Sequence, residues 1–562
     1  MGRLIPFLWV LGLWAFGFPA LEQYNTTWDE ALGDYFFGER YLSYFTSLDP
    51  AYLEFDADPY PEDRTPDLGI SPFRNRPWEY YPVANILAAA TSDLLSRRLG
   101  WLDAFDGFHA LNLLLTAPLV FALFHFLWPR FGLVTATASL GFLFTAPRIV
   151  CHWMANIKDF PLMIFFTLTC FAFLVAYEAG SRRGLVAAGG LWGLSLGVKA
   201  NALFLPGIVA AVVLLARPPT PWQNRRPALF SSLFGAGLLG ATVLVASWPY
   251  LWADPLGRLW QHLEYIGFRS NYTRPESLAP VFEAVLLTTP IPFLLFAAIG
   301  LVPCGLRAVR REPTAILLLA WVAVVLGRYL LPQAVNFDGV RHFLELFPAL
   351  AALAGLGLAW TGQRLATLVS LRLRKPLKVL WTLCWLLPSS WATLASHPFQ
   401  IAWWNSLAGG PAGAYARDLP QAGDYWGMSY RHGIRWLNEN APPGSLLAVP
   451  VIEHAVRLVA QERLRDDIVL LPITSPLSPR IPPERLQKTV EASLDRPLYV
   501  MFVERRDWMN ALMADCLQRL EPEVVWELDG APILRIYRYQ PAFRPPPVDE
   551  DTNPPKADLS PR

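Results

Sequence analysis

The chain has 562 residues, of which 53% are hydrophobic and only 17% are charged. Soluble domains of ordinary composition carry about 25% charged residues, and here the deficit falls in long apolar runs, which indicates a polytopic membrane protein. The net charge of +1 gives no reason to expect a nucleic-acid partner. The five cysteines have no metal-ligand spacing, so neither a disulfide framework nor a metal cluster follows from them.

Windows of apolar sequence predict about 11 transmembrane helices. The first run follows Arg3 and could be a signal peptide, but the poorly formed cleavage site around Ala20 favours an uncleaved helix. The fifth and sixth runs are short and meet at a polar turn, which suggests a tight re-entry hairpin. The predicted spans are residues 4–21, 108–128, 133–150, 160–178, 184–199, 201–216, 228–248, 281–303, 314–331, 343–360 and 378–395.

Alternate loops are rich in arginine and poor in acidic residues, whereas residues 22–107 are rich in Asp and Glu. Because cytoplasmic loops carry an excess of Lys and Arg, the N-terminus is predicted to be cytoplasmic and the loop 22–107 to face outward. An odd number of spans then places the C-terminal region outside. The basic residues are Arg130, Arg182, Arg183, Arg217, Arg225, Arg226, Arg307, Arg310, Arg311, Arg364, Arg372, Arg374, Lys375 and Lys378.

The pattern divides the chain into a membrane domain (1–395, including the outer loop 22–107), a connecting segment (396–424), an outer α/β domain (425–540) and a Pro-rich tail (541–562) that we expect to be disordered. Within the α/β domain, a helix is predicted to end before Pro442-Pro443-Gly444, and a hairpin to turn at Asp529-Gly530. The expected elements are a helix at 429–440 and strands at 445–449, 468–471, 498–503, 524–528 and 533–537.

Polar side chains gather where the spans reach the outer face. A set of this kind can hold an anionic lipid headgroup with its cations and leave an aspartate to deprotonate a hydroxyl. Each member also has a simpler interpretation: a solvated loop acid, a helix N-cap, a snorkelling lysine or a headgroup contact. The residues are Asp29 and Glu30 after the first span, Lys158 and Asp159 before the fourth, Lys199 and Asn201 between the fifth and sixth, and Arg341 and His342 before the tenth.

An acidic pair after the first span, a second Asp after the third span and a large outer first loop resemble the GT-C glycosyltransferases, which use polyprenyl-phosphate sugars as donors. Several short motifs are similar to the protein O-mannosyltransferase-like branch (glycosyltransferase family 39) and its bacterial relatives. They are Glu79-Tyr80-Tyr81-Pro82, Asn156-Ile157-Lys158-Asp159-Phe160-Pro161, Gly197-Val198-Lys199-Ala200-Asn201-Ala202, Arg341-His342-Phe343, Trp404-Asn405-Ser406-Leu407-Ala408-Gly409-Gly410 and Asp424-Tyr425-Trp426-Gly427.

The resemblance implies inverting transfer of a sugar from a polyprenyl-phosphate donor to a hydroxyl of a protein, lipid or glycan. It implies a bacterial inner membrane location, with the site and the C-terminal domain extracytoplasmic. Some GT-C enzymes hold a divalent metal, so the resemblance leaves open whether this protein binds one. No other cofactor is expected. The implied roles are Asp29 as base with Glu30 beside it, Asp159 as a second acid, Lys158, Lys199, Arg341 and His342 around the donor phosphate, and Glu79, Tyr80, Tyr81 and Asn201 in the donor or acceptor pocket.

One departure concerns the end of the first loop. Relatives often place a lysine near the proline there, where this chain has Tyr80-Tyr81-Pro82. Other cations must then hold the phosphate. Trp78, Tyr80 and Tyr81 could stack on a sugar, line a lipid groove, or anchor the protein at the membrane interface.

Two other classes of protein fit part of the pattern. A lipid-linked-sugar transporter or flippase would also have many spans, but transporters usually show internal repeats and polar groups near the membrane midplane. Here the polar groups lie at the outer rim, and no repeat of fixed period is visible. A membrane scaffold whose outer domain binds a partner is the other alternative.

Overall fold

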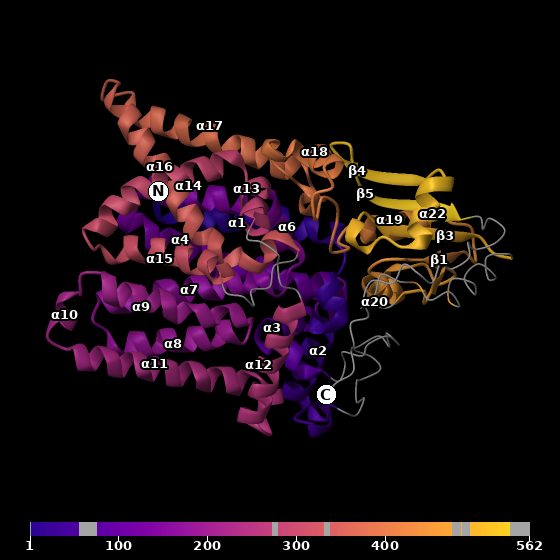
Figure 1. Ribbon diagram of the computed structural model, residues 1–562, viewed down its shortest axis with the longest axis horizontal. Coiled ribbons are helices and arrows are strands. Elements are labelled where there is room, and N and C mark those ends of the chain that lie inside the picture. Colours follow the sequence, from indigo (N-terminus) through magenta and orange to yellow (C-terminus); the bar gives the residue numbers. More distant parts are fainter. Residues whose placement is uncertain are drawn as a thin grey trace.

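The computed structural model describes residues 2–55, 76–272, 279–330, 338–474, 481, 485 and 495–539. A long bundle of helices forms most of the molecule, and a smaller domain with a β-sheet lies at one end of it (Figure 1). The predicted disordered tail, 541–562, lies outside the described residues.

Every predicted apolar run coincides with a helix or with a pair of helices. Seven of the described helices are long and apolar enough to cross a membrane, and the pair α5–α6, bent by 69°, would make an eighth. The polytopic helical fold is therefore confirmed, while the count of about 11 spans stays a prediction. The helices are α1 (Ile5–Ala20), α4 (Ala104–Phe131), α5 (Leu133–Phe144), α6 (Pro147–Ala155), α7 (Asp159–Glu178), α8 (Arg182–Leu196), α9 (Leu205–Leu215), α11 (Arg226–Ser247), α14 (Ile291–Val309), α15 (Pro313–Gly327), α16 (Phe347–Thr367) and α17 (Arg374–Ala395).

Prolines explain two differences from the predicted bounds. Pro147 begins α6, so the run predicted at 133–150 breaks into two helices, because proline lacks the N–H that would continue the first. Pro290 precedes α14, so the run predicted at 281–303 is shared between α13 (Ala279–Thr288) and α14.

The outer loop is largely helical. Its α2 packs against α3, and α3 packs against α4, which ties the loop to the membrane bundle. Its elements are η2 (Leu21–Gln23), the π-helix η3 (Glu30–Asp34), α2 (Tyr35–Ser47), η4 (Pro50–Leu53), η5 (Pro77–Glu79), α3 (Pro82–Ser92) and the π-helix η6 (Asp93–Arg98).

Several short elements and the 18-residue helix α12 connect these helices. They are η7 (Ala200–Phe204), α10 (Thr220–Gln223), η8 (Pro249–Trp252), α12 (Pro255–Tyr272), η9 (Arg328–Leu330), η10 (Gly339–Leu346), η11 (Gln400–Ala402), η12 (Ser406–Ala408) and α18 (Gly410–Ala416).

The C-terminal domain is the predicted α/β unit. Its sheet has the strand order β2-β1-β3-β5-β4, with β1 parallel to β2 and β3, and β5 antiparallel to β3 and β4. Asp529 and Gly530 both have positive φ, as the predicted tight hairpin requires. The elements are α19 (Tyr430–Asn440), β1 (Leu446–Ala448), α20 (Glu453–Arg463), β2 (Val469–Leu471), β3 (Leu498–Val503), η13 (Arg506–Trp508), α22 (Ala511–Arg519), β4 (Val524–Leu528) and β5 (Ala531–Tyr539).

Arginine residues gather at the end of the bundle far from the C-terminal sheet. Figure 1 shows α10 and the turn between α16 and α17 at the end far from the C-terminal sheet. Arginines follow or precede both segments, including Arg217, Arg225, Arg364 and Arg374. The orientation, in which this basic end is cytoplasmic, stays a prediction.

Candidate functional site

The segment after α1 turns its two adjacent acids in different directions. The backbone N–H of Thr27 donates to Glu30 Oε2 at 2.7 Å, a contact typical of a helix start with Glu three residues after Thr. The Glu30 carboxylate lies 2.9 Å from His109 Nε2 and is buried. Asp29 keeps 15% of its side chain exposed. Of the predicted acidic pair, Asp29 is partly exposed, whereas Glu30 is buried and contacts His109 of α4.

Asp29 is held by two of the predicted cations. Its Oδ2 accepts a hydrogen bond from Arg341 Nη1 at 2.8 Å and lies 3.7 Å from Lys158 Nζ. Arg341 belongs to η10, so a residue 312 positions away in the chain orients this carboxylate. Lys158 keeps 16% of its side chain exposed, whereas Arg341 keeps 3%. Arg341 is therefore an internal anchor for Asp29, and Lys158 is the accessible cation beside it.

Asp159 lies on the other side of Arg341. Its carboxylate pairs with Lys199 Nζ, accepts from Asn156 Nδ2 at 2.9 Å and lies 3.7 Å from Arg341 Nη1. Asn156 Oδ1 accepts from the backbone N–H groups of Lys158 and Asp159, at 3.1 and 2.7 Å. Asn156 thus supplies the capping bonds at the start of α7, and the Asp159 carboxylate is available for the cations.

Lys199 and Asn201 attach the turn before α9 to η10. Lys199 Nζ lies 3.3 Å from His342 Nδ1, and Asn201 Nδ2 donates to the His342 carbonyl at 2.9 Å and to Glu345 Oε1 at 3.0 Å. Since Lys199 is buried against Asp159, with 12% of its side chain exposed, it does not simply snorkel to the membrane surface. The predicted cations Lys158, Lys199, Arg341 and His342 therefore belong to one cluster.

Two acids of this cluster were not predicted from the sequence. Asp34 Oδ2 lies 3.3 Å from Lys158 Nζ, and its Oδ1 accepts from Asn85 Nδ2 at 3.0 Å. Burial raises the pKa of Asp34 to about 6, against the opposing effect of Lys158. Asp338 Oδ2 accepts from Arg341 Nη2 at 2.9 Å. The available signal for Asp34 was its place five residues after Asp29, which is about one turn of the π-helix η3.

Of the predicted pocket residues of the outer loop, Tyr80 and Tyr81 share one aromatic cluster, whereas Glu79 pairs with Arg76. Tyr80 stacks on Phe37 with ring centroids 5.0 Å apart, and Lys158 Nζ lies 5.7 Å from the Tyr80 ring centre. Glu79 instead contacts Arg76 at 3.2 Å. Tyr81 packs edge-on against His262, in a cluster of buried aromatic rings around Trp248 and Tyr250. Of the three, Tyr80 borders the ion-pair cluster.

The start of the C-terminal domain, directly after the connecting segment, places the aromatic side chain of Trp426 at the same cluster. The Asp424 carboxylate accepts from the backbone N–H groups of Trp426, Gly427 and Ser429, which fixes the turn. The carbonyl of Trp426 accepts from the backbone N–H of Trp28 at 3.2 Å, and the Arg341 guanidinium lies 4.8 Å from the Trp426 ring centre.

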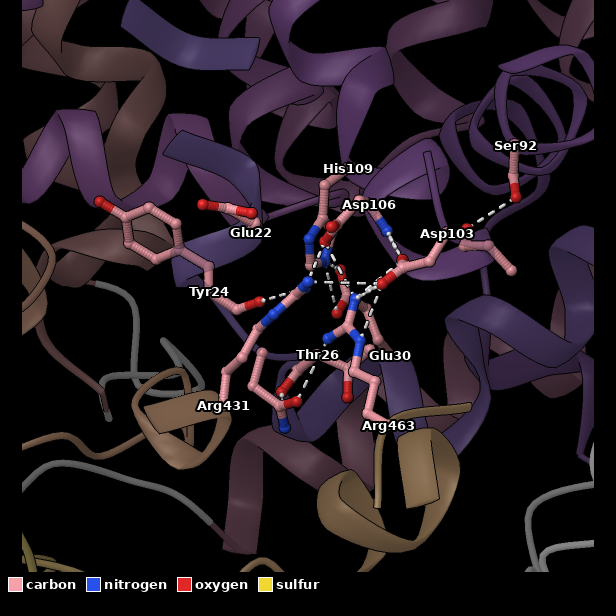
Figure 2. A network of polar contacts seen from close by, with 12 residues as sticks. Glu22, Tyr24, Thr26, Glu30, Ser92, Asp103, Asp106, His109, Arg431 and Arg463 are labelled. Atoms are coloured by element: carbon pink, nitrogen blue, oxygen red, sulfur yellow. Dashed lines mark hydrogen bonds and ion pairs between the residues drawn. The ribbon is translucent and has the colours of Figure 1, made fainter. Parts of the chain in front are cut away.

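A second network of charges fastens the C-terminal domain to the start of α4. Figure 2 shows the guanidinium groups of Arg431 and Arg463 beside the carboxylates of Asp103 and Asp106, with His109 and Glu30 close to them. Arg463 Nη2 lies 2.8 Å from Asp103 and 2.9 Å from Asp106, and Arg431 Nη1 lies 2.6 Å from Asp106. The domain also contacts the segment that precedes Asp29, where Thr26 Oγ1 donates to the Ala455 carbonyl at 3.1 Å.

The cluster combines four carboxylates with lysine and arginine side chains. Its acids Asp29, Asp34, Asp159 and Asp338 are each paired with Lys or Arg. Within the part of the chain that the structure describes, no group of three or more His, Cys, Asp or Glu side chains is arranged to hold a metal ion. The cluster can therefore exchange carboxylates for phosphate oxygens at its cations and accept a proton at Asp29.

Comparisons with known proteins identify the fold. No family model and no curated protein sequence matches the chain. ArnT from Cupriavidus metallidurans bound to undecaprenyl phosphate matches with a TM-score of 0.53 at 13% identity, over 94% of this chain and 97% of that one. Its apo state matches over the same shares, with a TM-score of 0.50 at 14% identity. AglB from Archaeoglobus fulgidus, in complex with an inhibitory peptide and a dolichol-phosphate, matches with a TM-score of 0.49 at 13% identity, over 88% of this chain and 69% of that one.

The matches to the two ArnT structures extend over almost the whole of this chain and of ArnT. The likeness therefore includes the C-terminal domain as well as the helical bundle. The membrane helical bundle with a C-terminal α/β domain expected from the sequence is thus confirmed as the fold that the chain shares with ArnT. Membership of the GT-C glycosyltransferases and of their mannosyltransferase-like branch stays a prediction.

Proposed function

We propose that this protein is a membrane glycosyltransferase that moves a sugar from a polyprenyl-phosphate donor to an acceptor hydroxyl. The observation that carries the proposal is Asp29, a partly exposed carboxylate held by Arg341 and Lys158 at the end of the membrane helices. The fold supports it, because ArnT, with the same fold, binds undecaprenyl phosphate.

The reaction follows from the roles of the groups. The acceptor oxygen forms a bond to the anomeric carbon while the bond from that carbon to the phosphate oxygen breaks. Asp29 takes the acceptor proton, and the lipid phosphate leaves with the bonding electron pair, so the anomeric carbon is inverted. A positioned base contributes about 10²–10⁴-fold to such a rate, and cations at the leaving phosphate supply electrostatic stabilisation.

The cations of the cluster differ in how exposed their side chains are, and this difference suggests which of them meet the phosphate. Lys158 and Lys199 are the more exposed members and are suited to meet the phosphate, while Arg341, with His342 beside it, stands behind them. A phosphate that binds there must displace carboxylates, since Lys158 contacts Asp29 and Asp34, and Lys199 contacts Asp159. The released Asp29 carboxylate would then face the acceptor.

We further propose that the site faces outward from a bacterial inner membrane, and that the sugar is a hexose such as mannose. The arginine-rich end opposite the C-terminal domain supports this orientation. The acceptor can be a protein, a lipid or a glycan, and a divalent metal is not required by these steps.

The test is sugar transfer by the purified full-length protein in lipid nanodiscs, with a panel of radiolabelled polyprenyl-phosphate sugars. We expect one donor to be consumed by the wild type, and Asp29→Asn to lower the rate at least about 10²-fold because it removes the base. Asp49→Asn, in the exposed turn before η4, is the matched control and should keep the wild-type rate.

Two results would contradict the proposal. Equal transfer by wild type and Asp29→Asn would remove Asp29 from the chemistry. If the wild type consumes no donor, yet it and Asp29→Asn bind polyprenyl phosphate equally, the transporter or flippase alternative is favoured, and a lipid-flipping assay in liposomes would then follow.

A further inference from the structure

We propose that the C-terminal domain completes the site by supplying Arg505 as a positioning residue for Asp29. This inference rests on the proposed function, since Asp29 is the base of that reaction. It assigns the domain a part in catalysis, exerted through Asp338 and Arg341, beyond any role in binding an acceptor.

A continuous chain of charged contacts joins Arg505 to the base. Arg505 Nη2 lies 3.1 Å from Asp338 Oδ1, and the other oxygen of Asp338 accepts from Arg341 Nη2 at 2.9 Å. The second terminal nitrogen of Arg341 donates to Asp29 at 2.8 Å. Because Arg505, Asp338 and Arg341 are all largely buried, these pairs are only weakly screened by solvent.

The middle of this chain needs support from outside its own segment. Asp338 has φ 55° and Gly339 has φ 65°, so the turn before η10 places a non-glycine residue in the left-handed region. Such a conformation persists only where the surroundings hold it. Arg505 holds it from the C-terminal domain, and its Nη1 is itself fixed by the carbonyl of Tyr425.

Arg505 also contacts the residue directly before the base. Its guanidinium lies 4.8 Å from the ring centre of Trp28, within the range of a cation–π interaction. The ring of Trp508, three residues after Arg505, packs edge-on against Trp28 with centroids 4.6 Å apart. One side chain of the C-terminal domain therefore constrains Asp29 from two directions, through its backbone neighbour and through its guanidinium partner.

Loss of Arg505 should affect catalysis more than donor binding. Asp338 would then have one charged partner fewer and would draw Arg341 away from Asp29. A misplaced base lowers the rate, and about 1 Å of displacement can cost up to about 10²-fold. Lys158 and Lys199, which we assign to the phosphate, are not in the contact chain of Arg505.

The pH profile should report the same change. Besides Arg341, the titratable groups that face Asp29 are Lys158, Asp34, Tyr80 and His454. A weaker hold by Arg341 would raise the pH at which Asp29 becomes an active base. The acid limb of the activity profile should therefore move to higher pH.

The experiment compares Arg505→Met, Arg505→Lys and Arg506→Met in the full-length protein. We expect Arg505→Met to lower kcat about 10–100-fold, with KM for the donor nearly unchanged and the acid limb shifted upward. Arg505→Lys, which keeps the charge, should restore part of the rate. Arg506 is the matched control, because it is the next residue but pairs with the exposed Asp418 at the surface.

Wild-type kcat and pH profile in a folded Arg505→Met would overturn this inference alone, provided that Asp29→Asn is inactive. An inactive wild type would instead overturn the proposed function. If Arg505→Met does not fold, Arg505→Lys and Trp508→Leu replace it. A reduced kcat with an upward acid limb in either variant supports the inference, and wild-type behaviour in both contradicts it.

Discussion

Asp34 and Asp29 share one lysine, and this makes Asp34 unusual among the acids of the site. Burial raises its pKa from 3.8 to about 6 in the folded protein, so Asp34 keeps its proton to a higher pH than it does in the unfolded chain. Between these two pH values the folded state binds more protons than the unfolded state. Stability must therefore fall as the pH rises through this window.

This predicts a stability difference between wild type and Asp34→Asn that depends on pH. Asparagine resembles the protonated acid, so the variant should lose the penalty that the wild type acquires on ionisation. We expect the wild type to become less stable relative to the variant by on the order of 3 kcal/mol between about pH 4 and pH 7. Thermal unfolding of both proteins at several pH values measures the difference.

Asp103→Asn serves as the control for the direction in which stability changes with pH. Burial alone would raise the pKa of Asp103, but Arg463, the backbone N–H of Asp106 and Arg431 together hold it below its usual value. The ionised Asp103 carboxylate stops contributing to stability only when the pH falls below the usual pKa of a carboxyl group. The difference in unfolding free energy between wild type and Asp103→Asn should therefore stay constant from pH 4.5 to 7.5. A constant difference for Asp34→Asn as well would show that the carboxyl is not perturbed.

The sequence could predict the charged side chains of the site that lie at the ends of apolar runs. Asp29, Lys158, Asp159, Lys199 and Arg341 were found in this way, and the structure brings them together. The direction of Glu30 was not predictable, because neighbouring helical residues point about 100° apart and only the fold decides which one faces inward. Asp338 and Arg505 come together through tertiary contacts that have no local signal.

At the scale of elements, the crossing of α14 and α16 determines where η10 can lie. The two backbones meet at Gly300 and Gly357, where a Cβ on either residue would overlap a carbonyl oxygen of the opposite helix. Small residues permit this close approach in membrane bundles. Since α16 continues directly from η10, the crossing also positions Arg341.

We therefore expect Gly300→Ala to destabilise the protein by about 1–3 kcal/mol, the usual effect of overpacking. Gly305 lies on the same helix with open space around its Cα, so Gly305→Ala is the matched control. The control should be neutral or slightly stabilising, because alanine favours helices over glycine. Thermal unfolding in the same detergent tests both, and equal midpoints would argue against a tight crossing.

Helices and strands with a clear pattern were predicted well. The apolar runs and the strand segments of the C-terminal domain recur in the structure with small shifts, and the shifts at Pro147 and Pro290 follow from proline itself. The helices of the outer loop were not predicted, because their burial depends on packing against α4 more than on a regular apolar period.

At the scale of the whole molecule, the charge network around Asp103 makes the two domains one unit. Arg463→Met should remove the most connected cation and leave Asp103 and Asp106 dependent on Arg431. We expect a loss of roughly 2–4 kcal/mol, somewhat below that of a fully buried pair, because 27% of the Asp103 side chain is exposed. Limited proteolysis and thermal unfolding should both report a loosened C-terminal domain.

Arg519→Met is the control for this prediction. Arg519 also pairs with an aspartate, Asp515, but the pair lies within one helix at the surface of the same domain. Surface pairs of this kind are worth about 0–1 kcal/mol. If both variants unfold alike, the network contributes no more than a surface pair.

The contact of Arg505 with Asp338 has a consequence for biosynthesis. Asp29 is made among the first residues of the chain, but Arg505 is made only after all the membrane helices. At about 5–20 residues per second, the ribosome needs roughly 25 to 95 s to pass from one to the other. A nascent or truncated chain that has reached the membrane therefore contains Asp29 before the contact of Arg505 with Asp338 can form. On the proposed function, lipid-linked donors would be spared until synthesis is complete.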